Sequence, residues 1–397
     1  MNPRPIIALL AAASLATPLA AESAAIAVPM QNSAGEQRSE ASAGLAMFTP
    51  AATRRDHRID YAHWDEALQW LVIPMGPSIR IGAGRVEPRT GTRRIYGHES
   101  RYRLEGNRVA FSFVTPEIRE AVSAYRADLE RVGTDLDITT LPRNEQLAFW
   151  LNLHNVAVIE ALLARYPLAR ADERVFGDGT TELEDAKLVT VAGVALSPRD
   201  IRERIVYPNW RDPKVIYGFW RGAIGGPSIQ RVAFTGGNVD ALLSLSAEEF
   251  VNSLRGVERW GGRLRLSPIY QEAAPFYFAD EASLRAHLAT FAGEDVARLV
   301  SETEQVRYKD YIHDIADLAR GERDPALSFL NEQPCGSGEC KPNILVSEPV
   351  QTRINPAIQR LMAERQTKLQ RAIDRGIRLG TVIYGGEGPD GSAPEVE

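Results

Sequence analysis

Cysteine and long apolar runs are both scarce in this sequence. The chain has 397 residues and only two cysteines, too few for a small domain held together by disulfides. After residue 21, no uninterrupted apolar stretch reaches the roughly 20 residues that a membrane span needs. The net charge is −6, and no block of basic residues interrupts the mixture of signs. We therefore expect a soluble globular protein with no transmembrane segment and no nucleic-acid partner.

Motifs for metals and nucleotides are also missing. The chain has no HExxH and no paired CxxC, the patterns that typically hold zinc. The glycine run GAIGG at 222–226 lacks the GxGxxG spacing and has no Walker lysine, so it does not predict a phosphate-binding loop. The histidines and acids of segment 56–65 predict the solvated start of a helix. We therefore predict no metal and no cofactor.

The first residues are typical of an export signal. Arg4 supplies a positive start, Ile6 to Leu19 is a short apolar stretch, and Ala20 and Ala21 offer a cleavage site. We therefore interpret residues 1–21 as a signal peptide cut near Ala20–Ala21. Residues 22–55 are poor in large apolar side chains and predict a flexible leader. The protein is expected to be periplasmic or secreted.

Cys335 and Cys340 lie close together, with four residues between them, two of which are glycine. In an oxidising compartment a nearby pair of cysteines usually forms a bridge, so we predict a disulfide. A redox-active or metal-binding pair is the alternative, although two thiols make only half of a zinc site.

Helical and strand-like patterns are interleaved along residues 56–320 without a βαβ rhythm, which indicates one large α+β domain. Segment 144–166 is apolar on nearly all sides, so we predict a buried central helix packed on a small mixed or antiparallel sheet. Segment 212–220 predicts a buried strand, and Gly106-Asn107 predicts a hairpin.

The C-terminal part is predicted to hold three further segments. Residues 321–350 form a loop closed by the disulfide, residues 351–380 an amphipathic helix, and residues 381–397 a mobile tail. The helix can pack on the domain or on a partner, including a second copy through residues 355–380. Its apolar face consists of Ile358, Leu361, Met362, Leu369 and Ile373.

The stretch EQLAFWLNLHNVAVIEAL at 145–162 resembles the core helix of the family called domain of unknown function 547, which carries FW-x-N-L-Y-N-A. Other segments look like further parts of that family, in the same order. The resemblance covers about residues 56–320. These segments are IDYAHWDEAL (59–68), LSPRDIRERIV (196–206), DPKVIYGFWRGAIGGPSI (212–229) and QVRYKDYIHDIADL (305–318).

The chain differs from this family at the positions that would carry its chemistry. The family usually has two cysteines in the turn, where this chain has Arg221 and Gly226. It usually has Glu-His where this chain has Arg202 and Glu203, and Tyr where this chain has His154. A thiolate nucleophile needs sulfur and a base. The resemblance therefore implies a turn of retained shape that has lost its thiol chemistry.

The candidate catalytic residues are His154, Glu203 and Arg221. A buried histidine with a lowered pKa can act as a base at neutral pH, but a lone histidine on an apolar helix face is also typical of a protein core. Glu203 and Arg221 can form an ion pair that fills a former site, clamp a charged ligand, or lie apart on the surface.

The candidate binding residues are Asn152, Asn155, Gly222, Gly226 and Ser228. A buried amide is costly unless it is bonded, so the two asparagines either line a pocket or tie down neighbouring loops. Ser228 follows a Gly-Gly-Pro turn but lies in no G-x-S-x-G elbow, so we do not expect it to be a nucleophile.

Together these features favour a non-catalytic protein that binds a small ligand or an envelope component through an inherited cleft. One alternative is a cell-envelope hydrolase that uses His154 with Glu203 or Arg221. Another is an interaction protein that uses its C-terminal helix.

Overall fold

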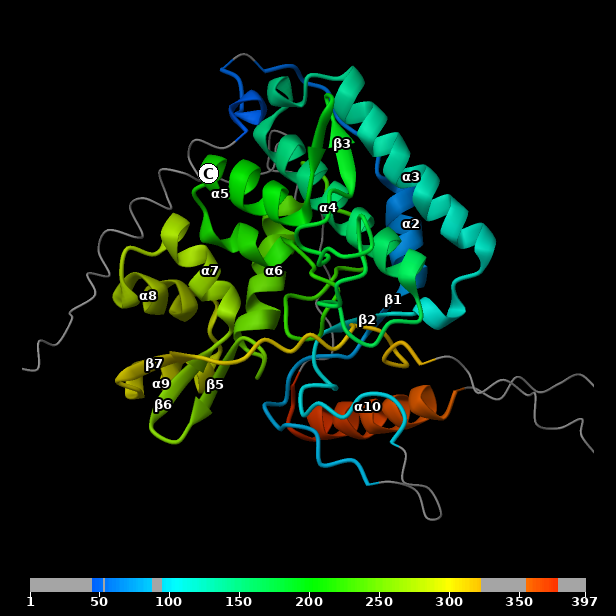
Figure 1. The fold of residues 1–397 in the computed structure, drawn as a ribbon. Coiled ribbons are helices and arrows are strands. Elements are labelled where there is room, and N and C mark those ends of the chain that lie inside the picture. The colour runs from blue at the N-terminus through cyan, green and yellow to red at the C-terminus, as the bar shows by residue number, and fades with distance from the viewer. Residues whose placement is uncertain (1–44, 53, 88–94, 323–354, 378–397) are drawn as a thin grey trace, which may run out of the picture.

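The computed structural model describes residues 45–52, 54–87, 95–322 and 355–377. Its centre is helix α4 (Arg143–Arg165), which the other helices surround (Figure 1). Every residue from Asn144 to Ile159 is buried, so the predicted central helix is confirmed. Among the described residues α4 is the one helix with the length and hydropathy of a membrane span, and 83% of its apolar window is buried inside the protein.

The remaining helices are mostly short and lie on both sides of α4 (Figure 1). The α-helices are α2 (Ala62–Leu71), α3 (Pro116–Asp135), α5 (Tyr207–Asn209), α6 (Val239–Val251), α7 (Pro268–Tyr277), α8 (Glu281–Phe291), α9 (Glu294–Glu302) and α10 (Pro356–Asp374). The 3-10 helices are η1 (Ala46–Phe48), η2 (Phe111–Phe113), η3 (Ile138–Thr140) and η5 (Pro213–Gly218), and η4 (Asp200–Val206) is a π-helix.

The strands form three small sheets. The antiparallel pairs are β1 (Val72–Pro74) with β2 (Asn107–Val109) and β3 (Val189–Val191) with β4 (Val194–Leu196). The third sheet has the order β5-β6-β7, in which β5 (Val257–Trp260) pairs antiparallel and β7 (Gln305–Tyr308) pairs parallel with β6 (Arg263–Leu266). Many helices with small antiparallel and mixed sheets make this an α+β fold, as predicted.

Two local predictions were wrong. Segment 212–220 was expected to be a buried strand, but Pro213–Gly218 forms the 3-10 helix η5. Asp212 caps this helix by accepting a hydrogen bond from Lys214 N at 2.9 Å, and Pro213 at the first position favours the helical start. Gly106-Asn107 does not turn a hairpin, because Asn107 begins β2, whose partner is β1 rather than the preceding segment.

Helix α10 packs on the chain's own domain, beside β1 and β2 (Figure 1). Ile358 and Leu361 are buried together with Met75 and Leu318 in a small second core, whereas Ile373, which was assigned to the same apolar face, is 52% exposed. The contact to the domain therefore extends along the predicted face as far as Leu369, which lies against Gly76, and leaves Ile373 in solvent. Self-association through this helix stays a prediction.

Lys368 attaches α10 to the rest of the domain by binding backbone carbonyl groups. Its Nζ donates to the carbonyl oxygens of Met75, Gly76 and Leu104 at 3.1, 3.0 and 2.6 Å, and the side chain is 3% exposed. A buried ammonium is tolerated only where its hydrogen bonds are satisfied. The ammonium therefore needs the three carbonyl groups as acceptors, and the carbonyl groups need the ammonium as their donor.

We expect Lys368→Met to lower the free energy of unfolding by roughly 3 kcal/mol, because three buried carbonyl oxygens lose their donor. Urea unfolding measures this loss, and hydrogen exchange shows whether α10 opens first. Gln366→Met, an exposed position on the same helix, is the control and is expected to stay within about 0.5 kcal/mol of the wild type. Equal stability of the two variants would contradict this account.

Candidate functional site

The turn after η5 carries Arg221, and a distant segment holds it in place. Ile224 N donates to Asp314 O at 2.9 Å, and Gly225 N donates to Ile312 O at 3.0 Å. Gly222 has a φ of +74°, and a Cβ there would collide with Leu162 of α4. Glycine is required at this position because it has no side chain and accepts a positive φ.

Arg221 forms a bidentate ion pair with Glu272 of α7. Its Nη1 and Nη2 lie 2.7 and 2.6 Å from the two carboxylate oxygens of Glu272. Glu203 does not take this place: it pairs with Arg199 at 3.4 Å, one turn earlier in the same helical segment. The ion pair considered between Glu203 and Arg221 is therefore replaced by one between Glu272 and Arg221.

Arg202 lies beneath this pair and has no solvent exposure. Its guanidinium is bound to Glu184, and its Nε lies 3.5 Å from Glu272. Burial alone would raise the pKa of Glu272, but Arg221 and Arg202 together lower it to about 2. Two arginines and two carboxylates thus form a buried network that balances its own charge.

A cavity of about 220 Å³ opens above this network. Its wall contains both charge signs together with the rings of Tyr311 and His313, and within the described part of the chain no cysteine, serine or threonine lines it. Burial lowers the pKa of His313, whose Nδ1 lies 3.7 Å from Asp172. The wall consists of Ala171, Asp172, Glu182, Leu183, Glu184, Arg199, Arg221, Ala223, Pro268, Glu272, Tyr311 and His313.

His154 lies outside this wall, inside the protein core. It has no solvent exposure, its Nδ1 is 3.0 Å from Asn155 Oδ1, and its Nε2 is 3.3 Å from Arg202 Nη1. Phe219 contacts the ring edge to face. Burial and the neighbouring Arg202 hold the pKa of His154 well below its usual range, so the ring is neutral. The guanidinium of Arg202 separates it from the Arg221–Glu272 pair.

The two asparagines of α4 bind loop backbones. Asn152 donates to Phe234 O at 2.7 Å and accepts from Phe234 N at 3.1 Å. Asn155 donates to Gly218 O and accepts from Trp220 N, both at 3.0 Å. Neither asparagine lines the cavity. Of the two roles considered for them, the geometry matches the one in which they tie down neighbouring loops.

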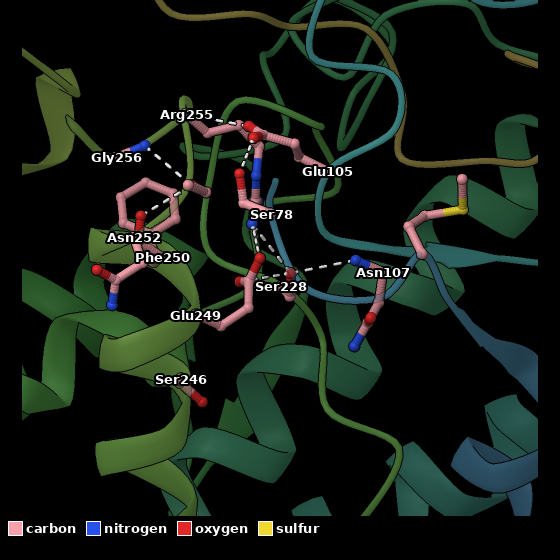
Figure 2. Close-up of polar contacts among 12 residues, drawn as sticks. Ser78, Glu105, Asn107, Ser228, Ser246, Glu249, Phe250, Asn252, Arg255 and Gly256 are labelled. Carbon is pink, nitrogen blue, oxygen red and sulfur yellow. Dashed lines mark hydrogen bonds and ion pairs between the residues drawn. The ribbon is translucent and has the colours of Figure 1, made fainter. Parts of the chain in front are cut away.

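Ser228 belongs to a separate polar cluster, shown in Figure 2, which joins the turn to β2 and α6. Its hydroxyl donates to Glu249 at 2.9 Å and accepts from the backbone nitrogen of Asn107 at 3.1 Å. Arg255 binds Glu249 and the carbonyl oxygen of Gly226. The hydroxyl therefore fastens the end of the turn, which agrees with the expectation that it is not a nucleophile.

Tyr311 fills the space beside Gly226. A Cβ on residue 226 would collide with the hydroxyl oxygen of Tyr311, so no larger residue fits there without a shift. That hydroxyl is buried and has no hydrogen-bond partner among the described residues. The turn thus holds a paired guanidinium at Arg221 and, at Gly226, a glycine that makes room for the tyrosine.

Sequence reasoning missed Glu272, Glu184 and Tyr311. Glu272 had a detectable signal, since it is a single acid within the aromatic segment PIYQEAAPFYF, where an acid is rarely buried unless it is paired. Glu184 and Tyr311 lie in ordinary polar surroundings and gave no signal. Cys335 and Cys340 lie outside the described residues, so the disulfide stays a prediction.

Glu272→Gln is expected to lower the free energy of unfolding by about 3–5 kcal/mol at neutral pH, because Arg221 and Arg202 lose their shared carboxylate. The folded-state pKa of Glu272 is lowered to about 2. Its contribution is therefore complete above the ordinary carboxyl pKa of about 4.3 and is lost as the pH falls toward 2. When the free energy of unfolding is measured at several acidic pH values, it is expected to fall less steeply with decreasing pH in the variant than in the wild type.

Glu203→Gln is the matched control, because burial and the nearby Glu272 raise the pKa of Glu203 instead of lowering it. This variant is expected to keep or gain stability at neutral pH. If both variants lose stability equally, the network described here does not hold the site together.

Comparison with known proteins bears on the same region. Residues 138–251 match the family model described as protein of unknown function, DUF547. No curated protein and no solved structure matches the chain. The matched segment includes His154, Arg202 and Arg221 but ends before Glu272 and Tyr311, so the cavity joins the family segment to residues outside it. Residues 138–251 of this chain are therefore similar to the DUF547 family of proteins of unknown function.

Proposed function

We propose that this protein binds a small polar ligand in the cavity above the Arg221–Glu272 pair, without thiol catalysis. The observation that carries the proposal is the pair itself, which places a paired guanidinium in a turn that has no cysteine. A bidentate arginine–carboxylate pair is rigid and directional, and it forms the floor of a site that stays open.

The cavity wall indicates the kind of ligand. It contains the carboxylates of Asp172, Glu182 and Glu184 and the guanidiniums of Arg199 and Arg221, so a ligand with one charge only would be repelled by the side chains of like sign. The volume of about 220 Å³ is below the roughly 300–1,000 Å³ of sites for drug-sized ligands. A small zwitterion, such as a free amino acid or a dipeptide, fits both the charge and the size.

The test measures thermal unfolding with a panel of free amino acids and dipeptides, beside simple amines and carboxylates of similar size. A zwitterion is expected to raise Tm in proportion to the logarithm of its concentration, and single-charge compounds are not. Arg199→Gln is expected to weaken binding at least tenfold, because Arg199 lines the cavity.

Arg204→Gln is the matched control for this test. Arg199 and Arg204 lie in the same helical segment, are 41% and 48% exposed, and each pairs with an acid one turn away. Arg204 does not line the cavity. The proposal fails if no zwitterion shifts Tm, or if the two variants bind equally.

A hydrolase is the second candidate, and His313 rather than His154 favours it. His313 lies in the cavity wall near Asp172, an arrangement that can orient a neutral imidazole as a base toward water. His154 lacks solvent contact, so we expect His154→Gln to change stability and no activity. Hydrolysis of an ester or dipeptide that is lost in His313→Gln would replace the binding proposal with this one.

A further inference from the structure

The sheet β5-β6-β7 lies at an edge of the molecule, on the opposite side from α2 and α3 (Figure 1). Its strands pair Trp260 with Arg263, and Arg263 with Gln305. They also place Arg265 directly opposite Arg307. Since directly paired residues point to the same side of a sheet, one face carries three arginines and a tryptophan. We call Trp260, Arg263, Arg265 and Arg307 the arginine face.

The other face of this sheet is turned to the protein. Leu264 and Leu266 alternate with the arginines of β6 and are fully buried. Trp260, at the end of β5 beside the turn Gly261-Gly262, is 60% exposed. Strand β6 therefore shows the alternation of a half-buried strand, and the side of it that faces solvent is basic.

The charge of the arginine face is not neutralised within the described part of the chain. Arg263 donates to the neutral amide of Gln305 at 3.2 Å, Arg265 lies 5.1 Å from the ring centroid of Trp260, and neither they nor Arg307 form an ion pair there. Like charges placed directly opposite on neighbouring strands destabilise a sheet. The opposed pair of Arg265 and Arg307 is therefore stabilised when an anion lies above both guanidiniums.

The nearby carboxylates form no ion pair with the arginine face among the described residues. Glu258 lies across from Arg265, but it is buried and bound by Arg101 and the Tyr102 hydroxyl, each at 2.7 Å. Glu302 is 3.8 Å from Arg259. Glu302 and Glu304 line a surface hollow together with Trp260 and Arg263, so Arg265 and Arg307 are the two guanidiniums of the face that lie outside this hollow.

We propose that the arginine face docks this protein onto the phosphate groups of an anionic lipid surface. Guanidiniums bind phosphate in a bidentate manner, and tryptophan is enriched at the boundary between lipid and water because its ring is amphipathic. An exposed tryptophan at a glycine turn beside three arginines offers both contacts on one side of a small flat sheet.

Nucleic acid is the other common partner of such a face, and one observation disfavours it. Base stacking needs a free aromatic face, but Arg265 covers one side of the Trp260 ring.

The experiment is co-sedimentation of the full chain with vesicles of phosphatidylcholine alone and of phosphatidylcholine mixed with phosphatidylglycerol. We expect binding to the mixed vesicles that weakens as salt screens the charges. The triple variant Arg263→Gln, Arg265→Gln, Arg307→Gln is expected to bind about 100-fold more weakly, given the usual contribution of each arginine near an anionic surface. Its Tm is expected to be unchanged or higher, because it loses the opposed charges.

The control variant is Arg131→Gln, Arg174→Gln, Arg298→Gln, which makes the same change of charge at three exposed arginines that each pair with an acid. It is expected to bind like the wild type. Equal binding by the two triple variants, or no preference of the wild type for phosphatidylglycerol, would overturn the proposal. So would binding to a single-stranded oligonucleotide without binding to vesicles.

Discussion

The fold depends on one constraint: α4 is buried on all sides although it carries polar side chains. An amide or imidazole inside a core must find partners there, since water cannot reach it. Asn152 and Asn155 meet this requirement by binding the backbones of two separate loops. His154 meets it by contacting Asn155 and Arg202. The polar groups of one helix thus determine where the surrounding loops lie.

The charged network at the cavity floor follows from that arrangement. Arg202 projects from η4, a π-helix, and such turns occur frequently at functional sites. Once its guanidinium is inside the protein, acids must accompany it, and Glu184 and Glu272 come from distant parts of the chain. Glu272 then serves Arg221 as well. Four segments beyond the central helix are held together by charges that none of them could bury alone.

Much of the helical framework could be predicted from the sequence. The apolar run of α4 is a local feature of the sequence, and so is the helix start at Ser197-Pro198, where the backbone nitrogen of Asp200 donates to Ser197 Oγ at 3.2 Å. Segment 212–220 was mistaken for a strand because a short run of apolar residues has no periodicity to separate a buried strand from a tight helix.

The residues of the site were harder to predict, because the side chains that form its ion pairs are far apart along the chain. Arg221 and Glu272 are 51 residues apart, and no local pattern pairs them. Glu203 looked the better partner because it lies at a position where the family usually has histidine. Its side chain binds Arg199 within the same helical segment instead, a contact that spacing along a helix does favour.

The attachment of α10 has a consequence for the order in which the protein is made. Lys368 binds carbonyl groups of residues that precede it by 293, 292 and 264 positions. The small core around Met75 therefore stays incomplete until α10 has been synthesised. Contacts over such separations form late, since long loops must close first. The segment around Met75 therefore has to wait for α10, and a chain released before α10 is made would leave that core open to water.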